Sequence, residues 1–173
     1  MADQPTPWQR IAAYRRLWIV AAVALAADQA TKLAILARFP HLTYGPPAHI
    51  EVIPGFFNLV HVGNTGAAWS LFAGRSAWLA GLALVTLVAI YLWRRHLGLK
   101  ERFAQPCFGL LCGGIVGNFI DRVWHGHVID FLDFHFGSYI YPTFNIADSC
   151  IVIGVIGYML WSLRQPAPAE DQV

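Results

Sequence analysis

The chain has 173 residues, of which 57% are hydrophobic and only 13% are charged. An ordinary soluble domain carries about 25% charged residues, so the composition excludes one and indicates a single membrane domain over residues 1–173. The formal net charge of +2 is small and the basic residues are scattered, which argues against nucleic-acid binding.

Four apolar stretches each approach the length of about 20 residues that a membrane-spanning helix needs. The polar segments at residues 1–10 and 165–173 are predicted to be disordered ends. The sequence therefore predicts an all-α membrane protein with four transmembrane helices, at residues 17–36, 77–93, 103–120 and 144–163.

The basic residues indicate how these helices are oriented. Lys and Arg are concentrated before the first helix, between the second and third, and after the fourth. The opposite side has only Arg38, Arg75 and Arg122. Because loops rich in Lys and Arg stay inside the cell, both termini are predicted to be cytoplasmic, and the loops at residues 37–76 and 121–143 are predicted to lie outside.

Residues 39–63 have a different character from the apolar helices. Prolines interrupt this segment, and the stretches Ile50–Ile53 and Phe56–Val62 flank a Pro54-Gly55 turn. Short β-prone runs on either side of such a turn are typical of a hairpin. We therefore expect a small β-rich platform on the outer side, whose strand edges could bind an extended peptide.

Charged and polar residues occur inside or beside the apolar helices, where they are rare and usually functional. Asp28 and Lys32 are four residues apart with the acid first, which favours an ion pair on one helix face. We favour this structural pair over direct catalysis. Lys32 acting as the base for a serine nucleophile is the alternative.

Further polar side chains lie near the predicted outer surface. Asn64 follows the β-prone segment and is equally consistent with a helix cap and with a group that holds a substrate carbonyl. Asn118, Asp121 and Arg122 share one side of the third helix. Arg122 could hold nearby carboxylates ionised or bind a carbonyl, whereas Asp121 is expected to be an interfacial anchor.

Two carboxylates dominate the C-terminal part of the chain. Asp130 is flanked by apolar residues, so burial should raise its pKa. Asp148 lies in the first turn of the last helix, after Asn145 or Thr143, where the helix dipole favours a negative charge. If the two side chains converge, they share one proton near neutral pH, as the acid/base pair of an aspartic protease requires.

Three alternatives to this pair remain open. Asp133 is a rival carboxylate, which we expect in a solvated loop. A metal site could use His125, His127, Asp130 and His135, although residue type is its only support. A small proton-coupled carrier would also need carboxylates within the membrane.

Five stretches of the chain carry a resemblance to a known family. In order, they resemble the motifs of the lipoprotein signal peptidases, also called signal peptidase II. The stretches are Asp28–Lys32, Asn64–Ala68, Gly113–Arg122, Val128–Phe131 and Phe144–Asp148.

The resemblance implies a multi-pass aspartic endopeptidase of the bacterial inner membrane, with its active site near the periplasmic face. Such an enzyme removes the signal peptide of a diacylglyceryl-modified prolipoprotein, cutting before the lipidated cysteine. It implies membrane lipids as surroundings and neither a metal nor an organic cofactor. The catalytic pair would be Asp130 and Asp148, supported by Asp28, Lys32, Asn64, Asn118, Arg122 and Asn145.

Overall fold

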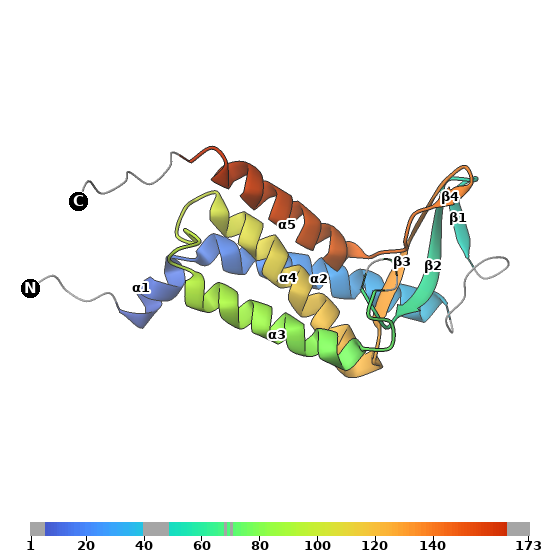
Figure 1. The fold of residues 1–173 in the computed structure, drawn as a ribbon, viewed down its shortest axis with the longest axis horizontal. Coiled ribbons are helices and arrows are strands. Elements are labelled where there is room, and N and C mark those ends of the chain that lie inside the picture. Colours follow the sequence, from blue (N-terminus) through green and yellow to red (C-terminus); the bar gives the residue numbers. More distant parts are fainter. Residues whose placement is uncertain (1–5, 40–48, 68, 70, 166–173) are drawn as a thin grey trace, which may run out of the picture.

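A computed structural model of the chain describes residues 6–39, 49–67, 69 and 71–165. Long helices lie side by side in a bundle, with a small sheet at one end (Figure 1). The helices are α1 (Pro7–Ala12), α2 (Arg15–Arg38), α3 (Ser76–Trp93), α4 (Ala104–His125) and α5 (Ile146–Ser162). The strands are β1 (Ile50–Ile53), β2 (Phe57–Asn64), β3 (Val128–Phe136) and β4 (Tyr139–Ile140).

The helices confirm the apolar segments that the sequence predicts. α2, α3 and α4 are long and apolar enough to cross a membrane, and α5 is a shorter apolar helix of 17 residues. α4 continues five residues beyond the predicted end at residue 120 and stops at Gly126, whose φ of 75° closes the helix. Glycine adopts this left-handed conformation without steric penalty.

Glycines on α4 allow it to approach α2 closely. A Cβ atom at Gly113 would lie 2.7 Å from the Ala21 carbonyl oxygen, and one at Gly117 would overlap the Asp28 carboxylate. Gly113 and Gly117 therefore lie on the surface of α4 that contacts α2. Close backbone approach of this kind is how helices associate where no hydrophobic effect drives them together.

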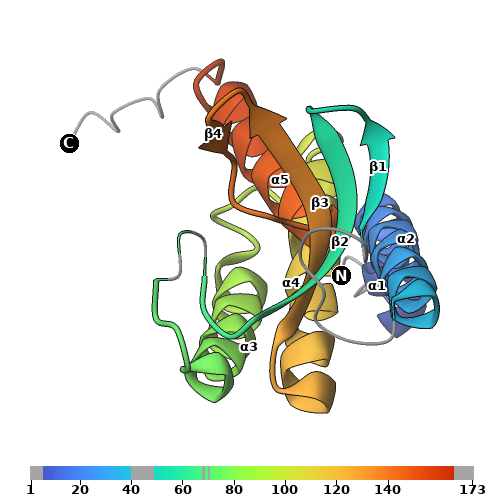
Figure 2. The same ribbon diagram turned by 90° about the vertical axis from the view of Figure 1, so that its right-hand side faces the viewer.

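The four strands form one antiparallel sheet in the order β1-β2-β3-β4. Figure 2 views the molecule from the sheet end. β1 and β2 flank the Pro54-Gly55 turn, as the sequence predicts, whereas residues 40–48 of the expected platform lie outside the described residues. A cluster of Ile35, Phe39, Ile129 and Phe131 attaches the sheet to the end of α2.

Two expectations need correction. Residues 128–136, which fall in the loop predicted at residues 121–143, form the strand β3, because they pair with β2 from a distant part of the chain. Residues 7–10 of the expected disordered end begin α1 instead. Thr6 accepts a hydrogen bond from the Gln9 amide and the Gln9 side chain accepts one from the Thr6 amide, which together stabilise a helix start.

Candidate functional site

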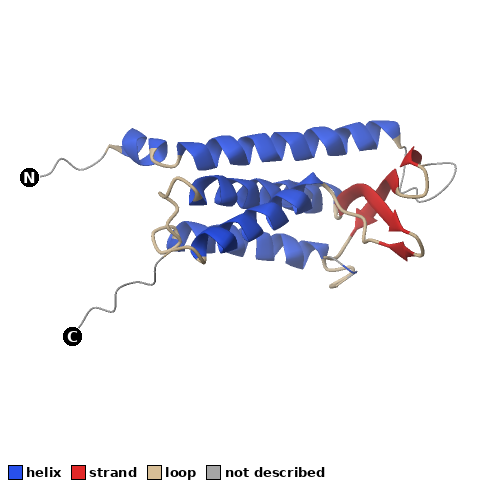
Figure 3. Ribbon diagram, turned by 90° about the horizontal axis from the view of Figure 1, so that it is seen from above, coloured by secondary structure: helices blue, strands red, loops and turns tan. Residues whose placement is uncertain are grey.

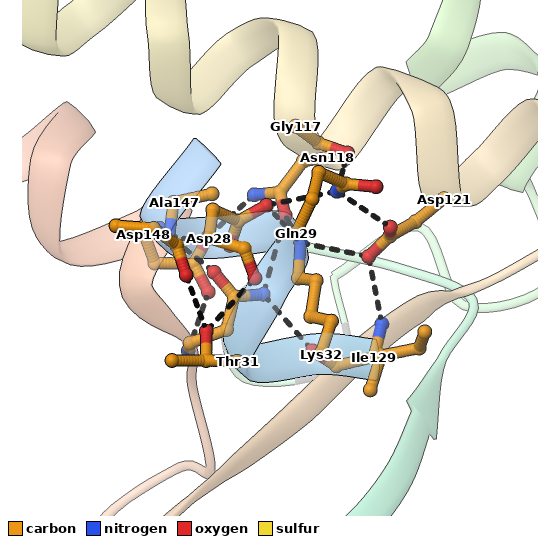
Figure 4. Close-up of polar contacts among 12 residues, drawn as sticks. Asp28, Gln29, Thr31, Lys32, Gly117, Asn118, Asp121, Ile129, Ala147 and Asp148 are labelled. Carbon is orange, nitrogen blue, oxygen red and sulfur yellow. Dashed lines mark hydrogen bonds and ion pairs between the residues drawn. The ribbon is translucent and has the colours of Figure 1, made fainter. Parts of the chain in front are cut away.

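The predicted site residues converge where α2, α4 and α5 meet the sheet. Figure 4 shows this polar layer around Lys32, with side chains from all three helices pointing toward one another. Two groups of carboxylates lie within it. One surrounds Lys32, and the other consists of Asp130 and Asp148.

Lys32 is the cation of the first group and is 1% exposed. Its Nζ atom lies 2.9 Å from Asp28 Oδ2 and 2.7 Å from Asp121 Oδ2, and it donates a hydrogen bond to Asn118 Oδ1 at 3.0 Å. The predicted Asp28–Lys32 pair is confirmed. Each of the three N–H groups of the ammonium has an acceptor, so the geometry fits the structural pair that the sequence favours.

Asp121 is not the interfacial anchor that we expected. It is 1% exposed, and besides Lys32 it accepts a hydrogen bond from the Ile129 amide at 3.1 Å. The carboxylate therefore links α2 and α4 to the start of β3. The spacing to Asn118, which places both residues on one face of α4, was the available signal for this role.

Asp28 joins the first group to the start of α5. Its Oδ1 atom accepts a hydrogen bond from the Ala147 amide at 2.9 Å, which satisfies one of the free N–H groups at the start of that helix. Gln29, which the sequence analysis did not single out, donates to Asp28 at 3.0 Å and to Asp121 at 3.3 Å. These contacts hold α5 in register with α2 and α4.

Backbone pairing brings the second group together. The Phe131 and Leu132 amides donate to the Phe144 carbonyl at 3.0 and 2.8 Å, and the Phe144 amide donates back to Leu132 at 3.2 Å. The chain that enters α5 is thereby fixed against β3. Asp130 and the first turn of α5 become neighbours for this reason.

Asn145 bridges the two carboxylates of this group. Its side-chain amide donates to Asp130 Oδ1 at 2.7 Å, and its backbone N–H donates to Asp148 Oδ2 at 3.2 Å. Asn145 also caps α5, accepting a hydrogen bond from the Asp148 amide at 2.9 Å. One residue therefore sets the position of both acids relative to the helix start.

Two further amides complete the hydrogen bonding of the pair. Asn118 donates to Asp148 Oδ1 at 2.7 Å, and Asn64 donates to Asp130 Oδ2 at 2.9 Å. Asn64 ends strand β2 and is not a helix cap, so the first of its two readings is wrong. Neutral amides rather than cations hold both acids.

The surroundings of Asp130 alter its acidity. Burial, followed by the negative charge of Asp148, raises the pKa of Asp130 to about 7, against the lowering effect of the hydrogen bonds from Asn64 and Asn145. An ordinary aspartate has a pKa of about 3.9. Asp130 therefore keeps a proton at a pH where most aspartates are ionised, as a general acid requires.

A hollow of about 520 Å³ reaches Asp130, and Asp130 and Asn64 are among the residues that line it. Tyr141 and Trp69 also line it, and their ring centroids are 6.4 Å apart. Arg122 lies close by and donates to the Gly66 carbonyl at 3.0 Å. Among the described residues, its buried Nε atom has no hydrogen-bond partner.

The rival carboxylate and the histidines lie elsewhere. Asp133 is not in a solvated loop, because its side chain is 2% exposed in β3 and pairs with His135 at 2.6 Å. Asn58 donates to it at 3.2 Å. Within the described part of the chain, no three His, Cys, Asp or Glu side chains are grouped as metal ligands.

Comparison with known sequences extends over most of the chain. Residues 20–164 match the family described as signal peptidase (SPase) II. A lipoprotein signal peptidase from Thermosynechococcus vestitus is 44% identical over 149 residues, which cover 86% of this chain and 91% of the relative. One from Azoarcus is 45% identical over 152 residues, which cover 84% and 81%.

Solved structures share the fold. One described as a bacterial membrane enzyme superposes with a TM-score of 0.73 at 34% identity, covering 90% of this chain and 92% of the other. A second with the same description gives 0.68 at 33% identity, with coverage of 86% and 92%. The matched segment includes both groups of carboxylates, and the chain therefore belongs to the signal peptidase II family of proteases.

Proposed function

We propose that this chain is an aspartic endopeptidase of the bacterial inner membrane that removes signal peptides from diacylglyceryl-modified prolipoproteins. It cuts before the lipidated cysteine, with Asp130 and Asp148 as the catalytic pair. The single observation that carries this assignment is the Asn145 bridge, which holds the two carboxylates beside each other, with Asp130 lining an open hollow.

In the proposed reaction, Asp148 takes a proton from a water molecule whose oxygen attacks the scissile carbonyl carbon. Asp130, protonated near neutral pH because of its raised pKa, donates its proton to the carbonyl oxygen. The resulting diol collapses as Asp148 protonates the leaving nitrogen and Asp130 recovers a proton from a diol hydroxyl. The C–N bond breaks, and each acid returns to its starting state.

Six side chains support this pair in our proposal. Lys32 and Asp28 hold the helices around it, and Asn64, Asn118 and Asn145 orient the two acids. Arg122 donates to the carbonyl of Gly66, which lines the hollow, and its buried Nε atom has no hydrogen-bond partner among the described residues. It would donate that N–H to a carbonyl of the bound signal peptide.

The substrate reaches the site within the membrane. Its two acyl chains contribute about 0.8 kcal/mol for each CH₂ group buried in lipid, which keeps the scissile bond at a constant depth. The outer edge of β1 pairs with no other strand in the described part of the chain. This edge and the backbone of residues 62–67, which lines the hollow, could bind the extended peptide.

For the topology, we propose four membrane crossings with both termini in the cytoplasm. The loop between α3 and α4 carries Arg94, Arg95, Lys100 and Arg102. It lies at the same end of the bundle as the start of α2 and the end of α5 (Figure 1), and the strands lie at the other end (Figure 3). The sheet and the acidic pair lie at the opposite end. The positive-inside rule then puts the pair near the periplasmic face.

The test is cleavage of a synthetic diacylglyceryl-modified precursor peptide by purified protein in lipid, followed by mass spectrometry. Asp130→Asn and Asp148→Asn should each lower the turnover number at least about 10³-fold, since each removes one half of a coupled acid/base unit. Peptide binding and the melting temperature should change little, because asparagine keeps the shape of the side chain.

Asp133→Asn is the matched control, since Asp133 is a buried aspartate of the same strand with its own asparagine partner. It should cleave normally. Turnover retained by either pair variant would remove that residue from the catalytic role. Solute flux without peptide products would instead identify the protein as a carrier.

A further inference from the structure

A second hollow, of about 290 Å³, lies at the end of the bundle opposite the sheet. Its lining residues come from the start of α2 and from the connection between α3 and α4. They are Tyr14, Arg94, Arg95, Gly98, Lys100 and Glu101. Three cations against one carboxylate make this hollow a basic pocket, and the proposed proteolysis does not use it.

The cations of the basic pocket are available to a ligand. In the described part of the chain, the ion pairs involve Lys32 and His135, and none involves Arg94, Arg95 or Lys100. Arg94 uses one terminal nitrogen to donate to the Tyr91 carbonyl at 2.6 Å, which fixes the direction of its guanidinium group. The remaining N–H groups of these side chains suit an anion with several oxygens.

The two segments that line the basic pocket are held together by hydrogen bonds of a buried side chain. Gln105 is 5% exposed, and its side chain donates to the Ala13 carbonyl at 2.8 Å and to the Lys100 carbonyl at 3.3 Å. It also accepts a hydrogen bond from the Arg16 amide at 3.2 Å. This buried side chain thereby ties the start of α2 to the α3–α4 connection.

Two more contacts hold the α3–α4 connection against the bundle. Leu99 is 4% exposed and packs in the main apolar cluster, and Tyr158 of α5 donates a hydrogen bond to the Leu97 carbonyl at 3.2 Å. The cations are therefore presented by a fixed backbone. Such preorganisation reduces the entropy lost when a ligand binds.

Exposed aromatic side chains lie within one helical turn, along the chain, of residues that line the basic pocket. Trp93 directly precedes Arg94, Trp18 lies one turn into α2 after Tyr14, and Phe103 precedes α4; they are 61%, 57% and 59% exposed. Exposed aromatic residues at helix ends are typical of the headgroup layer of a membrane. A ligand of the pocket would therefore lie within that layer.

We propose that the basic pocket binds the phosphate headgroup of an anionic membrane phospholipid, with the acyl chains lying along the exposed aromatic and apolar side chains. Basic pockets between transmembrane helices have this chemistry. A free phosphate ion would satisfy the cations but would leave the exposed aromatic side chains without a partner.

The test uses native mass spectrometry of the full chain, released from a neutral detergent and titrated with phosphatidylglycerol or with phosphatidylcholine of the same acyl chains. The unmodified chain should bind phosphatidylglycerol preferentially. The double variant Arg95→Gln/Lys100→Gln should bind it about tenfold more weakly or worse, since each cation contributes about 1 kcal/mol. Inorganic phosphate should not displace the lipid.

The matched control is Arg102→Gln/Arg164→Gln, which removes two exposed cations near the same end of the bundle but outside the pocket lining. It should bind phosphatidylglycerol within about twofold of the unmodified chain, because distant surface charges are screened. Glu101→Gln should strengthen binding, a gain that misfolding cannot produce.

Three results would overturn the proposal. Equal binding of the two lipids means that the pocket does not select an anionic headgroup. Equal losses in both double variants mean that general surface charge attracts the lipid. Displacement by inorganic phosphate means that the pocket is a site for a soluble anion.

Discussion

The two groups of carboxylates in this protein contain similar residues but have different surroundings. Asp28 and Asp121 each contact the Lys32 ammonium directly. Asp130 and Asp148 accept hydrogen bonds from the neutral amides of Asn64, Asn118 and Asn145, and in the described part of the chain neither forms an ion pair. The first group is neutralised by a buried cation, whereas in the second group burial and the charge of Asp148 raise the pKa of Asp130 to about 7. Similar carboxylates therefore differ because of their surroundings and not because of their residue type.

The largest effect is expected when the cation of the first group is removed. Lys32→Met would leave Asp28 and Asp121 buried without a cation, and this should lower the free energy of unfolding by about 3–5 kcal/mol. Chemical denaturation in detergent, followed by tryptophan fluorescence, measures the loss. Lys100→Met, which changes an exposed lysine, should leave the midpoint unchanged, and equal losses in both variants would contradict the role of the Lys32 group.

The next largest effect is a loss of turnover when Asn145, which bridges the second group, is changed. Asn145→Ser keeps a side-chain oxygen that can cap α5, because serine is as good a cap as asparagine, but it removes the amide that donates to Asp130. Turnover of the precursor peptide should fall about 10²-fold, within the range for a misplaced acid/base group. The melting temperature should change little; a large drop would mean that Asn145 acts mainly as a cap.

A substitution at Gly117 tests whether the close contact between α4 and Asp28 is needed for stability. Gly117→Ala places a methyl group against the Asp28 carboxylate, and such overpacking should destabilise the fold by about 1–3 kcal/mol. Gly81→Ala in α3, where a Cβ atom meets nothing within 4 Å, is the control. It should be neutral or slightly stabilising, because alanine favours a helix.

The smallest effect is a pH dependence that only the second group should produce. Because Asp130 must hold a proton and its pKa is raised to about 7, kcat should fall as the pH rises through that value, by about tenfold for each unit well above it. Asn64→Ala removes a hydrogen bond that lowers this pKa, so the fall should move to higher pH. A fall that stays in place would mean that another group controls the profile.

The sequence alone determined the parts of this protein that depend on local pattern. Runs of apolar residues mark α2 to α5, because a helix in lipid must be apolar along its length. The i,i+4 spacing predicts the Asp28–Lys32 pair, and the motif order carries the resemblance to signal peptidase II. The Pro54-Gly55 turn predicts the hairpin of β1 and β2.

Only the tertiary structure decided the features that depend on contacts between distant segments. β3 is a strand because β2 pairs with it, and Asp121 and Asp133 are buried because α2 and β2 bring partners to them. The basic pocket likewise needs Gln105 to join two separate segments. The free energy of such contacts depends on which residues meet in space, and the order of residues along the chain does not reveal that.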